Sequence, residues 1–453
     1  MSIASPRTLI EKYNRPGPRY TSYPTALQFA PVEDPEPLFE ASRSATMPLS
    51  LYYHLPFCES LCWFCACTTV ITCNRDRADV YLDALEKEMD MTLPLLNLEQ
   101  RTANQLHFGG GSPSFLTPKQ MDRLCTGIHK RFQLDSDAEI SAELDPRTLS
   151  EELIQVLASH GFNRASFGVQ DVDPKVQKAV HRIQPDEMNR RCIEWVRKAG
   201  IESLNVDLIY GLPYQTVDSF QQTLETVLTY EPDRLAVFSY AHVPWVAPAQ
   251  KILERSTLPD PETKFSMLIQ TIETLTANGY VYIGMDHFAK AGNELCQALE
   301  NGGLHRNFQG YTTKAGSELA GFGMSSISQN ADCYRQNMKE LKDWHAAIDE
   351  NRLPAHKGYT MTADDKLRRD IIMNIMCSGN VVYSRYEKEY GINFREMFAE
   401  AIGQLEEPAR DGLVEFNDQG FRVTTDGRLL LRNIAMPFDA YLEAGPRRHA
   451  KTI

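Results

Sequence analysis

The residues with the most reactive side chains are four cysteines in one decapeptide, CESLCWFCAC, at residues 58–67. Cys58, Cys62, Cys65 and Cys67 follow the spacing C-x3-C-x2-C-x-C. A structural zinc site usually draws C-x2-C pairs from two separate segments, but the other cysteines of this chain are scattered. An iron-sulfur cluster suits a single compact loop, because the thiolates bind neighbouring corners of one small cube. The spacing therefore favours an iron-sulfur cluster.

The number of cysteines bound to such a cluster would decide its role. If Cys58, Cys62 and Cys65 hold three irons, the fourth iron is either held by Cys67 or left open. A fully ligated cluster carries electrons, whereas an open iron can bind a substrate, much as a catalytic zinc site keeps a free position. The spacing alone leaves both roles open.

Composition and charge narrow the class of protein. The chain has 453 residues, of which 42% are hydrophobic and 24% are charged, as in ordinary globular proteins. No run approaches about 18 apolar residues and the start lacks an apolar signal, so we expect a cytoplasmic protein with reduced thiols and no membrane partner. The net charge of −13 disfavours nucleic acid, because binding to phosphate backbones depends on Lys and Arg. In the absence of a coiled coil or other assembly signal, we expect a monomer.

Six short apolar or alternating runs precede residue 300, and helix-like stretches separate them. The runs start at Leu49, Asn104, Ala138, Arg164, Ser203 and Arg234. This alternation predicts parallel strands with right-handed crossovers, in a full or partial barrel or in an open doubly wound sheet. Functional side chains then gather where the strands end. The residues at these ends are Cys58, Gly109 to Gly111, Glu143, Gln170, Asp207, and Tyr240 with His242.

After residue 250 the pattern changes. ETKFSMLIQTIETLTANGY predicts a further helix, VYIGMDHFAK a strand-like run and LHRNFQGYTT a polar loop with aromatic residues. Helical stretches follow from about residue 361, and two β-rich runs flank a hairpin turn at residues 417–420. This order resembles a winged helix, but residues 361–453 hold 13 Lys or Arg against 15 Asp or Glu. The balance favours a packing or lid role over DNA binding.

The C-x3-C-x2-C loop and the glycine-rich end of the second strand together resemble the radical S-adenosylmethionine (SAM) superfamily. Longer motifs resemble, within it, the oxygen-independent coproporphyrinogen III oxidase family along nearly the whole chain. The motifs are GPRYTSYPTA, FCxxxCxFCxC, HFGGGSPS, AELDPR, FGVQD, VDLIYGLP, YIGMDHFA, HRNFQGYTT and GRLLLRNIAM. Related haem-chaperone proteins usually carry an aromatic residue in place of Cys67 and lack the N-terminal segment, so the oxidase family is favoured.

The resemblance implies an α/β fold: a partial (β/α)6 radical SAM barrel with an N-terminal segment and a mostly helical, winged-helix-like C-terminal domain. We expect residues 1–47 to cover the active site and residues 48–300 to form the barrel. Residues 301–360 would connect the two domains and carry a substrate-site loop. Residues 361–453 would form the C-terminal domain.

The resemblance also implies how cofactors are held. Cys58, Cys62 and Cys65 would bind a [4Fe-4S] cluster whose remaining iron binds SAM, with Cys67 beside the site. Two SAM molecules are implied. The matching positions are Tyr52, Gly110 and Glu143 for the first, and Phe64, Gly111, Ser112, Gln170, Arg182, Asp207, Ala241 and Ile327 for the second. Cys67 is also counted among the cofactor-binding positions.

The implied reaction is oxidative decarboxylation of the ring A and B propionates of coproporphyrinogen III to the vinyl groups of protoporphyrinogen IX, in haem biosynthesis. A 5'-deoxyadenosyl radical would start it, and a low-potential electron donor such as a flavodoxin or ferredoxin would be a partner. Because the substrate has four carboxylates, cationic or amide side chains must converge on it. The candidates are Arg19, His305, Arg306 and Gln309.

Two other functions stay open from the sequence. A haem-binding chaperone of the same superfamily would keep a cluster without oxidising coproporphyrinogen, but Cys67 and the N-terminal segment argue against it. A winged-helix regulator with a structural cluster is disfavoured by the acidic balance of residues 361–453.

Overall fold

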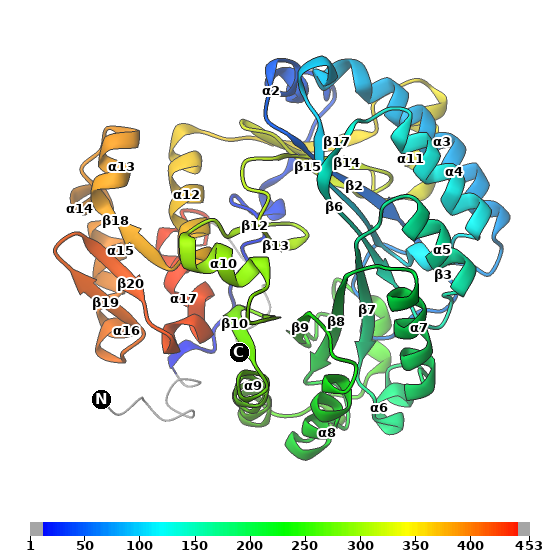
Figure 1. The fold of residues 1–453 in the computed structure, drawn as a ribbon. Helices are drawn as coiled ribbons and strands as arrows, with labels where there is room; N and C mark the ends of the chain where they lie inside the picture. Colours follow the sequence, from blue (N-terminus) through cyan, green and yellow to red (C-terminus); the bar gives the residue numbers. More distant parts are fainter. Residues whose placement is uncertain (1–11, 443–453) are drawn as a thin grey trace.

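A computed structural model describes residues 12–442 (Figure 1). Its main feature is a curved sheet of thirteen strands in the order β1-β17-β16-β15-β14-β2-β5-β6-β7-β8-β9-β11-β10. The six runs expected from the sequence form neighbouring parallel strands in chain order. They are β2 (Leu49–Leu55), β5 (Ala103–Gly110), β6 (Leu134–Leu144), β7 (Arg164–Gln170), β8 (Ser203–Tyr210) and β9 (Arg234–Ser239). The two edge strands, β1 and β10, do not pair with each other, so the expected partial barrel is confirmed and the sheet is not closed.

The helices that connect these strands cover the outer side of the barrel (Figure 1). They are α3 (Asp76–Thr92), α4 (Pro118–His129), α5 (Glu151–Ser159), α6 (Pro174–Ala179), α7 (Asp186–Lys198) and α8 (Val217–Leu228), with α9 (Pro261–Ala277) after β9. Strand β8 illustrates how the two faces of the sheet differ. Leu204, Val206 and Leu208 point to one face and belong to the hydrophobic core. Asn205 and Asp207 alternate with them and line a cavity inside the barrel. The barrel therefore has a polar interior and an apolar outer face under the helices.

Two of these helices begin at reciprocal capping pairs. The Thr117 hydroxyl accepts a hydrogen bond from Gln120 N at 3.3 Å, and the Gln120 side chain accepts one from Thr117 N at 3.0 Å. Thr216 and Ser219 form the same kind of pair at the start of α8. Each pair satisfies backbone N–H groups that have no partner inside the helix. The caps therefore fix where α4 and α8 begin after the ends of β5 and β8.

Two segments after residue 250 differ from the expectation. Residues 280–290 form a hairpin, β10 (Tyr280–Gly284) and β11 (His287–Lys290), instead of one strand, because Gly284 and Met285 adopt positive φ and reverse the chain. Residues 305–312 form a second hairpin, β12 (His305–Asn307) and β13 (Gly310–Thr312), instead of a loop. Its turn is held by the Asn307 side chain, which accepts a hydrogen bond from Gln309 N at 2.8 Å, and by Gly310 at φ +124°.

The main sheet continues on the other side of β2. Strand β14 (Glu318–Phe322) pairs in parallel with β2, and antiparallel strands then extend the sheet outward. The additional elements are β15 (Ile327–Gln329), β16 (Cys333–Asn337), α11 (Leu341–Asp349), β17 (Ala355–Thr360) and β1 (Ala30–Pro31). The division at residue 300 stays a prediction, but the sheet itself does not end there.

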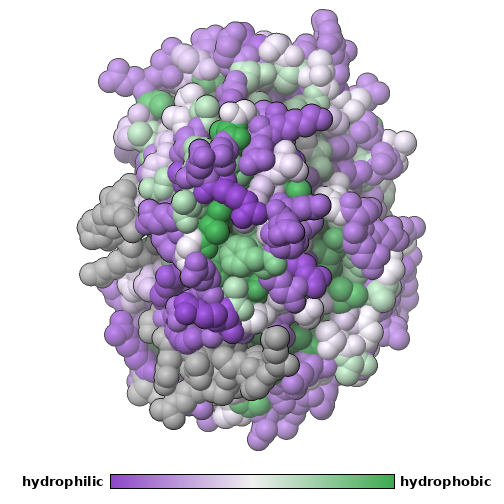
Figure 2. All heavy atoms as spheres, turned by 90° about the vertical axis from the view of Figure 1, so that its left-hand side faces the viewer, coloured by the Kyte–Doolittle hydropathy of each residue, from purple (hydrophilic) through white to green (hydrophobic). Residues whose placement is uncertain are grey.

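Residues 361–442 form a mostly helical C-terminal unit with its own hydrophobic core. Its elements are α12 (Ala363–Cys377), β18 (Asn380–Val382), α13 (Tyr383–Tyr390), α14 (Phe394–Met397), α15 (Ala399–Gln404), α16 (Glu406–Arg410), β19 (Val414–Asn417), β20 (Gly420–Val423) and α17 (Leu431–Ala435). The expected hairpin is β19–β20, and β18 completes a small antiparallel sheet with it. Figure 2 shows that the face on this side of the molecule is mostly hydrophilic.

The N-terminal segment packs onto the C-terminal unit. Tyr13, Tyr20 and Tyr23 belong to its hydrophobic core. The Tyr20 hydroxyl donates to Asp439 at 2.9 Å, and the Tyr23 hydroxyl accepts a hydrogen bond from Ala440 N at 3.0 Å. Residues from opposite ends of the sequence are thus held together beside the barrel. The expected N-terminal and C-terminal regions also include residues 1–11 and 443–453, which lie outside the described part.

The remaining elements are short. They are α2 (Glu40–Ser44), β3 (Phe57–Cys58), β4 (Val70–Ile71), α10 (Glu294–Asn301) and nine 3-10 turns between Ala26 and Phe438 among the described residues. Within residues 12–442, no helix has the length and apolar character needed to cross a membrane.

Glu88 joins helix α3 to the added strands. Its buried carboxylate accepts hydrogen bonds from Gly323 N at 2.8 Å, Asn337 Nδ2 at 2.6 Å and Trp344 Nε1 at 3.2 Å. We expect Glu88→Ala to lower the free energy of unfolding by roughly 3 kcal/mol or more, because three buried donors lose their acceptor. Denaturant unfolding followed by circular dichroism measures this change.

The matched control is Glu86→Ala on the same helix. Glu86 forms a partly exposed ion pair with Arg123 at 2.9 Å, and its loss should cost less than about 1 kcal/mol. Equal losses of stability in the two variants would contradict the special role of the Glu88 contacts.

Candidate active site

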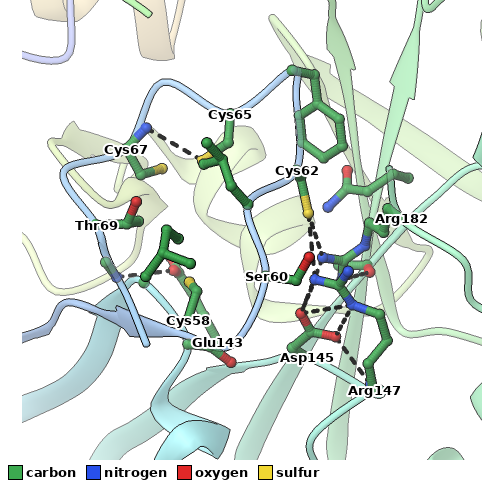
Figure 3. A pocket seen from close by; sticks show the side chains of 18 of the residues that line it. Cys58, Ser60, Cys62, Cys65, Cys67, Thr69, Glu143, Asp145, Arg147 and Arg182 are labelled. Atoms are coloured by element: carbon green, nitrogen blue, oxygen red, sulfur yellow. Dashed lines mark hydrogen bonds and ion pairs between the residues drawn. The ribbon is translucent and has the colours of Figure 1, made fainter. Parts of the chain in front are cut away.

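A cavity of about 180 Å³ lies at the C-terminal ends of the barrel strands, as the strand pattern predicts (Figure 3). The cysteine loop forms one wall and the ends of β5 to β8 form the other. Most of the predicted cluster and cofactor residues line it: Cys58, Cys62, Phe64, Cys65, Cys67, Gly110, Gly111, Ser112, Glu143, Gln170, Arg182 and Asp207. Sequence motifs up to 149 residues apart thus meet in one site, since Cys58 and Asp207 both line it.

The cysteine loop is anchored at both ends and in the middle. At its ends, Phe57 and Cys58 of β3 pair with Val70 and Ile71 of β4. In the middle, Cys65 N donates to Cys62 O at 3.0 Å, and Trp63 N donates to Val180 O at 3.0 Å. These backbone bonds fold the loop so that its thiols line the cavity.

The glycine-rich strand end is required by close packing against that loop. A Cβ atom on Gly111 would lie 2.4 Å from the Pro56 carbonyl oxygen, and Gly110 adopts φ +109° next to the His54 ring. Both positions exclude larger residues. Gly111 N donates to Leu55 O and Ser112 N donates to Phe57 O, each at 2.9 Å. The GGGS turn therefore holds the start of the cysteine loop against the end of β5.

The thiols of the loop differ in pKa. Burial raises the pKa of Cys58 to about 12. The hydrogen bond from Cys67 to Cys65 lowers the pKa of Cys65 to about 7. Cys67 N also donates to Cys65 Sγ at 3.4 Å. Cys67 is therefore a close neighbour of Cys65 as well as part of the cavity wall.

Two residues that the sequence reasoning did not select lie next to Cys62 (Figure 3). Arg147 Nη2 lies 3.3 Å from Cys62 Sγ and is held by Asp145, which also accepts from Arg182 at 3.1 Å. Burial opposes ionisation of Asp145, but the two guanidinium groups hold its pKa at about 2. Their position in AELDPR, directly after the strand end at Glu143, was the signal that could have identified them.

Glu143 and Asp207 lie deeper and respond differently to burial. Burial acts to raise the pKa of Glu143, but hydrogen bonds from His107 and Gly110 N, each at 3.3 Å, bring it below its usual value. For Asp207, burial and the nearby charge of Glu143 raise the pKa to about 7. Near neutral pH, one carboxyl is therefore charged and its neighbour is close to its midpoint.

A second cavity of about 260 Å³ lies inside the barrel and shares Glu143 and Asp207 with the first. Polar side chains of β5 to β9 form its walls, and the β12–β13 hairpin contributes Gln309 and Tyr311. Of the predicted substrate residues, Gln309 alone lines this cavity. The two cavities are adjacent, so a molecule in one can reach a molecule in the other.

The other predicted substrate residues lie elsewhere. His305 and Arg306 line a third cavity of about 460 Å³ between the hairpin and the C-terminal unit. Arg19 forms an ion pair with Asp286 at 3.3 Å. The hairpin therefore separates Arg306 from Gln309, although the two are close in sequence.

Three predicted cofactor residues line neither of the first two cavities: Tyr52, Ala241 and Ile327. Tyr52 is nevertheless close to the site, since its ring stacks on His107 at 6.0 Å and its hydroxyl lies 3.1 Å from His54 Nδ1. Ile327 belongs to β15 and packs near a small apolar cluster formed by Phe29, Tyr334 and Met361. Their proposed contacts are the ones least supported by the geometry.

The cavity fits a cluster with a bound amino acid derivative. Among the described residues, no group of three or more His, Cys, Asp or Glu side chains is placed to hold a metal ion. All four loop thiols line one cavity, and within residues 12–442 two buried polar atoms on its wall, Gln170 Oε1 and Arg182 Nε, have no hydrogen-bond partner. Buried polar atoms of this kind call for a ligand. The donor set therefore suits a cluster held by thiolates beside a polar molecule.

The raised pKa of Asp207 predicts a pH-dependent stability. Between about pH 4 and pH 7, Asp207 ionises in the unfolded chain but keeps its proton in the folded apoprotein, so its contribution to stability falls as the pH rises. The stability of Asp207→Asn relative to the natural apoprotein should rise across this range, by up to roughly 4 kcal/mol. Urea unfolding at several pH values measures the difference in free energy of unfolding between the variant and the natural apoprotein.

The control is Asp418→Asn, at an exposed position. If the difference for Asp207→Asn does not change with pH, the raised pKa of Asp207 is refuted.

Comparisons with known proteins agree with this site. Residues 52–227 match the radical SAM superfamily, and residues 361–430 match the HemN C-terminal domain. The oxygen-independent coproporphyrinogen III oxidase of Escherichia coli (strain K12) is 46% identical over 97% of this chain and 96% of its own length. That of Helicobacter pylori (strain J99) is 44% identical over 98% of both chains.

A solved structure of such an oxidase has the same fold as this chain. The coproporphyrinogen III oxidase (HemN) of Escherichia coli, described as a radical SAM enzyme, matches with a TM-score of 0.92 and 44% identity. The match covers 98% of this chain and all of that one. The identity and coverage extend across the barrel, the N-terminal segment and the C-terminal unit. The chain therefore belongs to the oxygen-independent coproporphyrinogen III oxidase family of the radical SAM superfamily.

Proposed function

We propose that this protein converts the ring A and B propionates of coproporphyrinogen III to vinyl groups and so produces protoporphyrinogen IX without oxygen. The observation that carries the proposal is similarity over 97% of the chain to relatives of that name. The cavity at the strand ends and the polar cavity beneath it provide places for cofactor and substrate. Each vinyl group forms when a propionate loses a hydrogen atom from its β-carbon and its carboxylate as CO2. One electron then passes to an acceptor, so each conversion is a two-electron oxidation of the substrate.

Membership of the radical SAM superfamily implies a [4Fe-4S] cluster and SAM. We assign Cys58, Cys62 and Cys65 as the cluster ligands and place Cys67 beside them. All four thiols line one cavity, which supports thiolate ligation there, and the choice of three ligands follows the C-x3-C-x2-C motif of the family. When bound and reduced, the cofactors would supply a 5'-deoxyadenosyl radical, and the chemistry it would provide is removal of a hydrogen atom from the propionate β-carbon.

The chain's own residues would bind two SAM molecules. We assign Tyr52, Gly110 and Glu143 to the first and Phe64, Gly111, Ser112, Gln170, Arg182, Asp207, Ala241 and Ile327 to the second. The support differs between them: Glu143 is charged and can pair with an ammonium group, and Arg182 can bind a carboxylate. The exposed backbone of Gly110 and Gly111 lets a ligand approach closely. Two of the second set, Ala241 and Ile327, lie outside the first cavity.

The substrate would occupy the barrel interior and the region around the β12–β13 hairpin. Three buried donors near the hairpin have no hydrogen-bond partner within the described residues: Arg306 Nε, Arg306 Nη1 and Gln309 Nε2. Such donors are expected in a site that binds a carboxylate of the substrate. Burial and the charge of Arg19 lower the pKa of Arg432 to about 10. The charge of Arg306 also lowers this pKa, whereas Asp286, which pairs with Arg19, acts to raise it. Three arginines around one carboxylate leave positive charge that can attract a substrate carboxylate. Arg432 was not selected from the sequence.

Two of the proposed substrate residues, His305 and Arg19, lie where the C-terminal unit and the N-terminal segment meet the barrel. His305 lines the outer cavity near the C-terminal unit, where burial lowers its pKa. The N-terminal segment contributes Arg19, whose guanidinium lies over the Phe238 ring at 5.8 Å. Packing of these two regions beside the barrel limits access of water to the site.

The partners and location complete the proposal. We place the protein in the cytoplasm as a monomer, reduced by a low-potential donor such as a flavodoxin or ferredoxin. A haem-binding chaperone is the second candidate, because such a protein would keep the cluster of the same superfamily. The substrate residues around the hairpin favour the oxidase.

An anaerobic assay tests the activity. Protein with a reconstituted cluster is incubated with coproporphyrinogen III, SAM, a reductant and an electron acceptor, and the products are separated by chromatography. We expect protoporphyrinogen IX to accumulate together with methionine and 5'-deoxyadenosine. Cleavage of SAM without any decarboxylated product would refute the oxidase, and stoichiometric haem binding would then support the chaperone.

The cysteine assignment predicts a difference within the loop. Cys58→Ala, Cys62→Ala and Cys65→Ala should each abolish the visible absorption of the cluster, because each removes an iron ligand. Cys67→Ala should keep most of the absorption, because the three proposed iron ligands remain. Anaerobic reconstitution followed by absorption spectroscopy and iron analysis measures this.

Cys73→Ala is the matched control for these variants, since Cys73 is an exposed thiol close to the loop. It should keep both cluster and activity. Loss of the cluster in Cys67→Ala would show that the set of three ligands is wrong.

A further inference from the structure

Cys62 differs from the other proposed ligands in its surroundings. Arg147 Nη2 lies 3.3 Å from its sulfur, and Arg182 Nη1 lies 3.5 Å from it. Within residues 12–442, no arginine lies at hydrogen-bond distance from the sulfur of Cys58 or Cys65, and the N–H that contacts Cys65 Sγ is the backbone group of Cys67. Figure 3 shows both guanidinium groups on the same side of Cys62, with Asp145 beside them and bonded to both. Of the three proposed ligand sulfurs, that of Cys62 is therefore the one with positively charged side chains next to it.

Arg147 is held rigidly in this position. Its Nε lies 3.0 Å from Asp145 Oδ1 and its Nη2 lies 2.6 Å from Asp145 Oδ2, a two-point contact that fixes the plane of the guanidinium. Asp145 in turn is anchored by its backbone N, which donates to Ser114 Oγ at 3.0 Å. The side chain of Arg147 therefore points at Cys62 without needing a ligand to place it.

The charges beside Cys62 do not cancel. Asp145 is ionised, since the two arginines hold its pKa at about 2, and it accepts from both Arg147 and Arg182. Two guanidinium groups and one carboxylate leave a net positive charge next to the sulfur. The side chains of Arg147 and Asp145 are mostly buried, at 17% and 12% exposure, so salt screens this charge only weakly.

Hydrogen bonds and positive charge at a cluster sulfur stabilise the reduced cluster more than the oxidised one, because reduction adds a negative charge that spreads over the sulfurs. Arg182 already has a proposed partner in SAM, through the unpaired Nε on the cavity wall. Arg147 lines the same cavity, but within residues 12–442 its side chain bonds to Asp145 and Cys62, and none of its buried atoms is left without a partner. Its place in the site is explained by the sulfur that it contacts.

We propose that Arg147 is a positioning residue that donates a hydrogen bond to the Cys62 thiolate and thereby raises the reduction potential of the cluster. The proposal rests on the assignment of Cys62 as a ligand. The chemistry is a one-electron reduction of the cluster by the external donor, and no bond of the protein is made or broken. Arg147 makes this reduction easier for a donor of limited strength, and Asp145 fixes the direction in which Arg147 points.

The test is an EPR-monitored redox titration of anaerobically reconstituted protein without SAM. Arg147→Gln removes the charge and the guanidinium. At a fixed solution potential we expect the ratio of reduced to oxidised cluster to fall about tenfold, which corresponds to about 59 mV for one electron. Lys178→Gln is the control, because it removes one charge from an exposed position on α6 that has no contact with a cysteine. Its potential should stay at the value of the natural protein.

A second variant keeps the test decisive if Arg147→Gln cannot retain a cluster. Arg147→Lys preserves the charge, but a single ammonium cannot reproduce the planar fork that bonds Asp145 and points at Cys62. Its potential should lie below that of the natural protein. An unchanged potential in whichever of the two variants holds a cluster overturns the proposal, as does an equal shift in Lys178→Gln.

Turnover gives an independent measurement. With a reductant poised near the cluster potential, SAM cleavage by Arg147→Gln should slow, and a much stronger reductant should restore the rate. A purely structural role of Arg147 would leave a defect that no reductant corrects, and that result would refute the proposal. Failure of the oxidase assignment is distinguishable, because the titration needs neither coproporphyrinogen nor its product.

Discussion

The site depends on the close contact between the glycine-rich end of β5 and the chain that leads from β2 into the cysteine loop. A Cβ atom on Gly111 would come within 2.4 Å of the Pro56 carbonyl oxygen, so any side chain there would push the two strand ends apart. Backbone bonds from Gly111 N to Leu55 O and from Ser112 N to Phe57 O use the space that the missing side chain leaves. The start of the loop, and hence the direction of Cys58, follows from this contact. The same turn exposes backbone to the cavity, where a ligand can approach.

The second constraint is the polar interior of an open barrel. Alternation along each parallel strand sends apolar side chains outward to the helices and polar ones inward, so the interior is available for binding instead of being filled by a core. Burial then separates the behaviour of neighbouring carboxyls: Glu143 is kept charged by His107, whereas the pKa of Asp207 rises to about 7. A cationic cofactor and an anionic substrate require different charges a short distance apart. This interior provides them on adjacent strands.

The open side of the barrel is where the remaining parts of the chain collect. The β12–β13 hairpin carries Gln309 toward the interior and Arg306 toward the outer cavity, so one short segment contributes to both. Tyr20 and Tyr23 tie the N-terminal segment to residues 439 and 440 of the C-terminal unit. Arg19 is thereby held near Asp286 at the edge of the sheet. A closed barrel would leave no place for these contacts.

The sequence by itself indicated an iron-sulfur cluster, the six parallel strands and the edge at which the site lies, and the resemblance to a family added the [4Fe-4S] type. Those features depend on local spacing and on two-residue alternation, which a single chain displays directly: Cys58, Glu143 and Asp207 follow their strands as expected. Only the tertiary structure decided the features that require distant or weakly patterned segments to come together. Residues 305–312 looked like a loop because their strands are short and their pairing is set by a turn at Asn307 and Gly310. The contact of Arg147 with Cys62 joins residues 85 positions apart, and no periodicity or motif spacing records which of several polar neighbours a side chain will reach.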